Sequence, residues 1–229
     1  MIKQIIIVAV GVIGFALIWT YSHWGNVKSN IKKTITNKTD STATTISETL
    51  DLSQMPIATY SASTKNGNNL ELLFNIDGLK KTTGRFNDFS VYLKVDSVWQ
   101  KSNINVNINA SSIYTDNKMR DESLISDDFF DVKSYPEISF ISDSITLGDT
   151  SLIAHGKLEL KGIITPLSFP FIYYGSTKNN NGLFVYVFEG QFNLDRTQYG
   201  MLHEKGVGDI VHLSFYVDLM EEEYAKSMR

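Results

Sequence analysis

The sequence has no cysteine and very few prolines. Four of its 229 residues are prolines and none is a cysteine, which excludes disulfides, thiolate nucleophiles and cysteine-ligated zinc. This absence does not identify a compartment, because exported proteins without disulfides are common. Charge is also scarce: 20% of the residues are charged and the formal net charge is −4. Nothing in the composition therefore indicates a nucleic-acid partner.

Catalytic and metal-binding patterns are missing too. Asp127, Asp128 and Asp131 lie close together in "LISDDFFDVKSYPEISF", Leu124 to Phe140, but no nucleophile accompanies them. The calcium pattern D-x-[DN]-x-[DN]-G is absent, and the four histidines show no metal-ligand spacing. We therefore expect a protein that is not an enzyme and that uses no metal and no cofactor.

One long uncharged run stands near the N-terminus. It is "IIIVAVGVIGFALIWTY", Ile5 to Tyr21, which is at the short end of what spans a bilayer. Trp19, Tyr21 and Trp24 cluster at its end, as interfacial aromatic residues do. No good small-x-small cleavage site follows. We expect a transmembrane helix within residues 1–24, acting as an anchor or an uncleaved signal.

The sequence gives two conflicting indications of how this helix is oriented in the membrane. Four lysines follow it and would keep the main domain in the cytoplasm under the positive-inside rule. A very short charged segment before an apolar run is, however, typical of an export signal. We expect export: anchoring in the inner membrane at the cell envelope, with the main domain on the periplasmic or extracytoplasmic side.

The rest of the chain divides by composition and periodicity. Residues 25–55 are rich in Thr, Ser, Lys and Asn and predict a flexible linker. Residues 56–220 form the predicted main domain, and residues 221–229 a C-terminal tail. Within the main domain, apolar residues recur with a period of two, as in "NINVNINA", Asn103 to Ala110. About eight or nine such strand candidates are separated by turn-rich segments.

Half-buried antiparallel strands need one common interior. A sandwich and a closed barrel both provide one, and a barrel of about eight strands can hold one small ligand. One stretch, Tyr114 to Tyr135, is helical or irregular in pattern. Within it, Ser126 or Asp127 can cap a short helical turn over Ser126–Val132. We expect that turn to direct Phe129 and Phe130 into the mouth of the barrel and its acids into water.

Four motifs in order resemble one known family. "MRDESLISDDFFDVKSYPEISFIS" (Met119–Ser142) resembles the Arg-Asp-x-x-Leu…Asp-Phe-Phe-Asp-Val…Tyr-Pro-x-Ile-x-Phe core of the YceI-like polyisoprenoid-binding family. The other three are "GKLELKGIITPLSFPF" (Gly156–Phe171), "FEGQFNLDRTQYGM" (Phe188–Met201) and "VGDIVHLSFYVDL" (Val207–Leu219). "TTGRFNDFSVYL" is similar to an earlier strand of the family. The resemblance covers Ile57 to Leu219.

The resemblance implies an all-β, antiparallel, lipocalin-like barrel of about eight strands with one short helical loop insertion. It also implies a non-enzymatic carrier that holds a long-chain isoprenoid, or a fatty-acid-like lipid, inside the barrel. The alternative is a membrane-anchored structural or stress-related interaction domain with a packed barrel and no lipid. In either case the protein could form a homodimer, and the sequence does not decide this.

The predicted ligand-binding residues are the inward apolar positions, the Phe pair and two arginines. They are Phe74, Phe89, Val91, Ile108, Phe129, Phe130, Phe140, Leu158, Phe169, Phe171, Phe188, Phe192, Phe215, Arg120 and Arg196. Arg196 shares a strand face with large apolar residues, so its charge needs a partner. Asp121 or Asp128 is one candidate for that partner, and the phosphate of a prenyl phosphate is the other.

Overall fold

The structure is a computed structural model that describes residues 51–79, 81–201 and 205–223. The predicted transmembrane helix and most of the predicted linker lie outside these ranges. Within the ranges, no helix is both long enough and apolar enough to cross a membrane.

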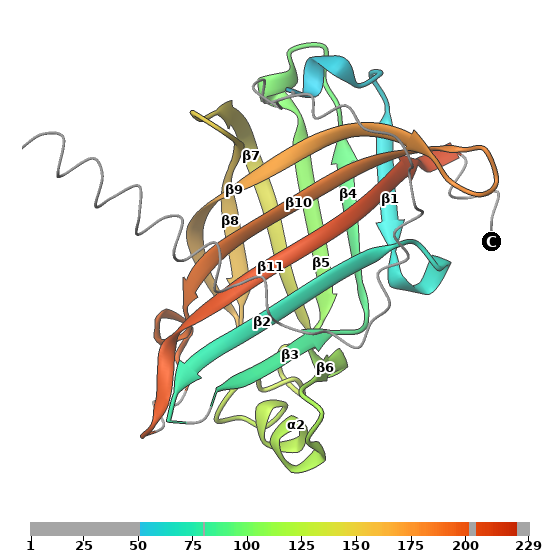
Figure 1. The fold of residues 1–229 in the computed structure, drawn as a ribbon. Helices are drawn as coiled ribbons and strands as arrows, with labels where there is room; N and C mark the ends of the chain where they lie inside the picture. The colour runs from blue at the N-terminus through green and yellow to red at the C-terminus, as the bar shows by residue number, and fades with distance from the viewer. Residues whose placement is uncertain (1–50, 80, 202–204, 224–229) are drawn as a thin grey trace, which may run out of the picture. The chain divides into compact units, whose positions relative to one another are not determined.

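The described part of the chain consists mainly of β-strands (Figure 1). The strands are β1 (Thr59–Ser63), β2 (Leu70–Gly78), β3 (Thr82–Phe86), β4 (Phe89–Lys94), β5 (Asn103–Asn109), β6 (Ile113–Tyr114), β7 (Glu137–Leu147), β8 (Leu152–Leu160), β9 (Ile163–Lys178), β10 (Phe184–Asp195) and β11 (Val207–Glu221). The helix α2 (Lys118–Leu124) lies between β6 and β7. Short 3-10 helices are η1 (Leu52–Gln54), η2 (Thr64–Asn66), η3 (Trp99–Lys101), η4 (Ala110–Ser112) and η5 (Arg196–Tyr199).

The sheet closes on itself. Its order runs β1-β4-β5-β7-β8-β9-β10-β11, every pairing is antiparallel, and β1 also pairs with β11. Past short interruptions, β2 continues β1, β3 continues β4, and β6 continues β5, so that β11 also pairs with β2. The eleven strands thus occupy eight positions around a ring. The prediction of an antiparallel barrel of about eight strands is confirmed, and the sandwich is excluded.

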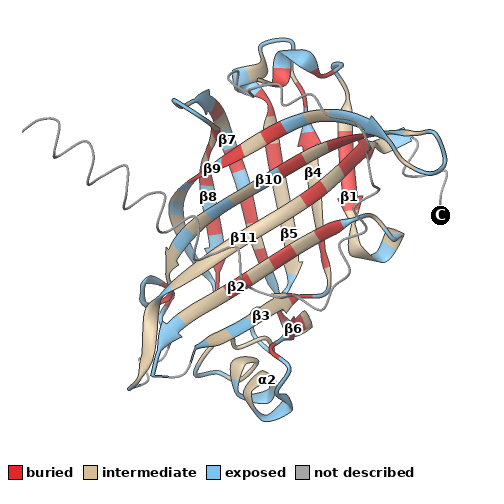
Figure 2. Cartoon of the chain, in the orientation of Figure 1, coloured by how far each residue is buried: buried red, intermediate tan, exposed pale blue. Residues whose placement is uncertain are grey.

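Alternation along the strands separates the interior from the surface. In β2, Leu70, Leu72 and Phe74 are buried while the residues between them are half-buried, and β8 alternates in the same way from Leu152 to Leu160. The buried positions form bands across the barrel wall (Figure 2). The period of two in the sequence therefore predicts correctly which side of β2 and of β8 is apolar.

One end of the barrel is filled by side chains. Leu52 and Tyr60 are fully buried, and the Tyr60 ring meets the Tyr186 ring edge-on with centroids 4.7 Å apart. The Tyr60 hydroxyl donates a hydrogen bond to the Pro56 carbonyl at 2.8 Å. Met55 is also buried. The core therefore includes residues just before the predicted domain start at 56, and Glu221 of β11 lies just past its predicted end at 220.

The opposite end carries α2, and here the predicted helical turn is wrong. The helix covers Lys118–Leu124, and its N-cap is Asn117, whose side chain accepts from the Arg120 N–H. Residues 126–132 form turns instead of a helix. Asp131 has a φ of 46°, and its N–H bonds back to the Ser126 carbonyl at 2.7 Å. A left-handed residue there interrupts any helix and bends the chain back to β7.

Candidate functional site

The barrel encloses an apolar cavity of about 260 Å³, and residues of α2 form part of its wall. All fifteen residues predicted to bind ligand lie on its wall; whether they contact a ligand stays a prediction. They are Phe74, Phe89, Val91, Ile108, Phe129, Phe130, Phe140, Leu158, Phe169, Phe171, Phe188, Phe192, Phe215, Arg120 and Arg196.

The interior is hollow along much of its length. Val106, Ile108 and Leu213 face inward and line the cavity, yet they are only half-buried. By contrast, Ile145 and Leu152, which do not line it, are fully buried. An inward apolar side chain that keeps exposed surface faces a void, since a packed core leaves few gaps larger than a water molecule. The walls of this barrel therefore do not meet throughout.

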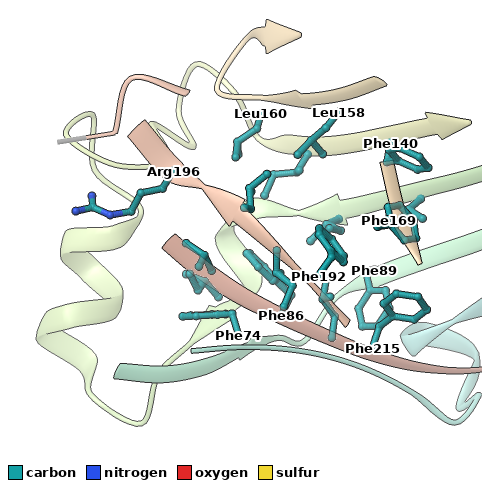
Figure 3. A pocket seen from close by; sticks show the side chains of 18 of the residues that line it. Phe74, Phe86, Phe89, Phe140, Leu158, Leu160, Phe169, Phe192, Arg196 and Phe215 are labelled. Carbon is teal, nitrogen blue, oxygen red and sulfur yellow. The ribbon is translucent and has the colours of Figure 1, made fainter. Parts of the chain in front are cut away.

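Aromatic rings narrow the cavity near its middle. The Phe169 ring stacks on Phe192 with centroids 4.8 Å apart, and it lies 5.0 Å from Phe140 and 5.8 Å from Phe215. Figure 3 shows these rings gathered inside the barrel, with Arg196 at the far end of the row.

The Phe pair lies at the mouth, as the sequence predicts. Phe129 and Phe130 are half-buried and line the cavity, and the Phe130 ring meets Phe86 edge-on at 5.9 Å. Asp127 and Asp128 are exposed. The Lys161 ammonium donates to the carbonyl of Asp127 at 2.7 Å and to that of Gly200 at 3.2 Å. This lysine therefore ties the segment that carries the Phe pair to the end of η5.

Arg196 is buried beside a different acid from the two predicted. It is 3% exposed, its Nε donates to the Gly208 carbonyl at 2.9 Å, and its Nη2 lies 3.3 Å from Asp209 Oδ1. The prediction of Asp121 or Asp128 as its partner is wrong. Asp209 lies at the start of β11, the strand that pairs with β10, so the sheet itself brings it close to Arg196.

Arg120 is anchored by one threonine. Its Nε donates to Thr115 Oγ1 at 2.8 Å and its Nη2 donates to the Thr115 carbonyl at 2.7 Å. Asp121 also turns to Thr115, where its Oδ1 accepts from the backbone N–H at 2.9 Å and from the hydroxyl at 2.5 Å. Thr115 therefore fixes the position of α2 at the barrel mouth.

Sequence reasoning missed part of the cavity wall. Leu72, Leu93 and Ile104 alternate in register with predicted positions, so the same period of two would have found them. Ser123 and Met201 lie outside the regular strands, and no periodic signal marks them.

The two described histidines lie apart and hydrogen-bond to polar neighbours. His155 on β8 sits between Thr146 at 2.8 Å and Ser168 at 2.9 Å. His212 lies on β11, separated from β8 by two strands. In the residues that the structure describes, no group of three or more His, Asp or Glu side chains could hold a metal ion.

The sequence matches a known family model and several curated relatives. A model described as "YceI-like domain" matches residues 17–219. The chain is 33% identical to a UPF0312 protein of Pseudomonas putida over 98 residues. The aligned residues are 42% of this chain and 51% of that protein. A UPF0312 protein of Shewanella denitrificans is 28% identical over 153 residues, 65% of this chain and 80% of that protein. The chain thus spans about half the length of the first curated relatives it matches.

Solved structures share the fold at low sequence identity. BcnA of Burkholderia cenocepacia has a TM-score of 0.57 and 22% identity, over 65% of this chain and 95% of that one. A polyisoprenoid binding domain from Saccharophagus degradans, implicated in plant cell wall breakdown, has a TM-score of 0.53 and 12% identity, over 72% of this chain and 99% of that one.

Proposed function

Because the chain belongs to the YceI-like domain family, we propose that it is a non-enzymatic carrier that holds a long-chain isoprenoid or similar lipid inside its barrel. The observation that carries this proposal is the hollow interior, where inward apolar side chains such as Val106 and Ile108 stay half-buried around a cavity closed at one end. The polyisoprenoid binding domain of Saccharophagus degradans shares this fold and directs the choice of ligand.

The energetics suit an apolar chain. Each buried methylene contributes about 0.8 kcal/mol, so a tail of about ten carbons supplies roughly 8 kcal/mol before the cost of association is subtracted. The cavity of about 260 Å³ lies just below the usual range of about 300–1,000 Å³ for ligand pockets. We therefore expect a single slender chain that fills the barrel lengthwise.

The carrier is proposed to act at the cell envelope, anchored by the N-terminal apolar run with the barrel on the extracytoplasmic side. A reporter that is active only outside the cytoplasm, fused to the C-terminus, tests this. We expect this reporter to be active. If it is inactive, and a matched second reporter that works only in the cytoplasm is active, then the C-terminus lies in the cytoplasm and the proposed orientation is wrong.

Native mass spectrometry of the purified full-length chain, followed by lipid extraction, tests the ligand. A bound apolar chain is expected after expression in a polyprenyl-rich host. Phe188→Asp should lose that lipid, since Phe188 lines the cavity and is 5% exposed. Glu189→Ala is the matched control, because Glu189 is the exposed neighbour on the same strand. Lipid retention by a folded Phe188→Asp variant would contradict the assigned wall.

A packed barrel without lipid is the second candidate. The contacts among Phe169, Phe192 and Phe215 favour it, since these rings already pack against one another inside the barrel without a ligand. In that case the purified protein carries no lipid, and the protein acts as an anchored structural or interaction domain.

A further inference from the structure

The pairing of β9 with β10 stops partway along the barrel wall. Its register ends where Gly190 lies opposite Phe171. Among the residues that the structure describes, Gln191–Asp195 pair only with β11, and Ile163–Pro170 pair only with β8. These two segments of β10 and β9 therefore border a seam, which runs without ladder pairing from Gly190 toward η5.

Two prolines explain why the ladder ends there. Pro166 and Pro170 have no backbone N–H, so neither can donate a hydrogen bond to a neighbouring strand. The backbone groups of alternate residues point to the same neighbour, and β9 keeps an unbroken register with β8 from Ile163 to Phe171. Both prolines therefore face β10. A Cβ on Gly190 would lie 2.7 Å from the Pro170 carbonyl oxygen, which agrees with that direction.

On the outer surface, side chains at the two edges of the seam bond away from it. Ser168 of β9 meets His155 of β8, with 2.9 Å between Oγ and Nδ1. Asn193 of β10 meets His212 of β11, with 2.7 Å between Oδ1 and Nδ1. Ser168 and Asn193 are both exposed, so solvent reaches the outer side of the seam.

The inner side of the seam is cavity wall. Leu167 and Phe169 of β9 line the cavity, as do Phe192 and Leu194 of β10. Leu167, Phe192 and Leu194 are only half-buried. The stack of Phe169 on Phe192, with centroids 4.8 Å apart, spans the seam. Aromatic rings rather than ladder bonds therefore join the two strands between cavity and surface.

Two hydrogen bonds close the end of the seam at η5. The hydroxyl oxygens of Thr165 on β9 and Tyr199 on η5 lie 2.5 Å apart. The Lys161 ammonium donates to the Gly200 carbonyl at 3.2 Å. Parting the seam breaks these bonds and the ring stack. Parting β10 from β11 would instead break a ladder of ten residue pairs, so the seam is the easier place to open the wall.

We propose that the seam is a lateral gate, and that the apolar chain of the ligand enters the barrel between β9 and β10. This inference rests on the carrier function proposed above and adds the route of entry. Phe129 and Phe130 obstruct the route along the barrel axis, because both line the cavity at the mouth. A side opening admits a long chain without displacing that pair or α2.

Cross-linking across the seam tests the gate. Ser168→Cys and Asn193→Cys are combined in the full-length protein, which has no other cysteine, and a short bismaleimide joins them. Native mass spectrometry follows farnesol uptake over time, before and after cross-linking. We expect cross-linking to slow uptake at least about tenfold. The final amount of bound farnesol should stay the same, because a gate alters rates and not the equilibrium.

Two further comparisons separate the gate from a general effect on the barrel. Asn107→Cys with Ser139→Cys bridges β5 and β7 where these strands are paired, and its cross-link should leave uptake unchanged. Tyr199→Phe removes the bond to Thr165 and should speed uptake about fivefold. Tyr92→Phe, on β4, should not change uptake.

Uptake at the wild-type rate through a fully cross-linked seam would show that the chain enters elsewhere. The gate would then be wrong while the carrier function stands. Equal slowing by the cross-link between β5 and β7 would also overturn the gate, since stiffening anywhere in the wall would have the same effect. If the wild type takes up no farnesol, both proposals fail.

Discussion

At the scale of single residues, small side chains decide how the rings share the interior. Ala154 on β8 pairs with Phe169 on β9, and Gly190 on β10 pairs with Phe215 on β11. In both pairs a small residue lies opposite a large aromatic ring. A Cβ on Gly190 would lie 2.5 Å from the Phe215 ring and 2.7 Å from the Pro170 carbonyl oxygen. Glycine at this position lets the Phe215 ring lean across β10 toward Phe169.

Gly190→Val should therefore destabilise the barrel. The new side chain displaces Phe215 and presses on backbone, and overpacking of this kind costs about 1–3 kcal/mol. Urea unfolding should show a lower midpoint than for Gln191→Ala, a change at the exposed neighbouring position. An unchanged midpoint would mean that the Phe215 ring moves freely aside.

Tyr173 should make the free energy of unfolding fall as the pH rises into the alkaline range. Burial raises the pKa of Tyr173 to about 12, whereas an unfolded tyrosine has a pKa of about 10. Below pH ~10 the phenol is protonated in both states and its contribution is complete. That contribution is lost as pH rises from about 10 through 12, because the unfolded chain ionises first. Urea midpoints across this window should fall more steeply in the wild type than in Tyr173→Phe, and equal slopes would contradict the assignment.

At the scale of elements, the sequence predicts the inward faces of the strands better than it predicts the structure of the segment at the barrel mouth. Alternation identifies the inward face of β2, β5 and β10, because a half-buried strand has only two sides. It cannot locate α2, where the Asn117 cap and the bonds to Thr115 decide the start and placement of the helix. It also cannot find the partner of Arg196, since Asp209 becomes its neighbour only through the pairing of β10 with β11.

The mouth segment should open more readily without Lys161. Its two hydrogen bonds join the Phe129–Phe130 segment to η5, and their loss should cost about 1 kcal/mol locally. Lys161→Met should therefore speed amide exchange in residues 126–135 and release of bound lipid by about fivefold. Lys157→Met, at an exposed position of β8, is the control. Exchange rates that match the wild type would show that Lys161 does not hold the mouth closed.

At the scale of the whole barrel, closure and hollowness depend on different parts of the chain. The ring closes through a short pairing, Tyr60 with Glu221 and Ser61 with Met220, beside the buried Tyr60–Tyr186 contact. The void lies between that closed end and α2. The sequence predicted the closed barrel through its family resemblance. It could not reveal which end stays open, since the buried Leu52 belongs to a segment whose composition resembles a linker.

The central claim is that the interior is hollow and holds a lipid chain. The most direct measurement is the lipid content by native mass spectrometry, together with the urea midpoint, of full-length Val106→Trp. Val106 lines the cavity and is half-buried, so the indole should fill the void. We predict loss of bound lipid with a midpoint equal to or above that of lipid-free wild type. A lowered midpoint from overpacking, or an unchanged lipid content in the folded variant, would contradict the account.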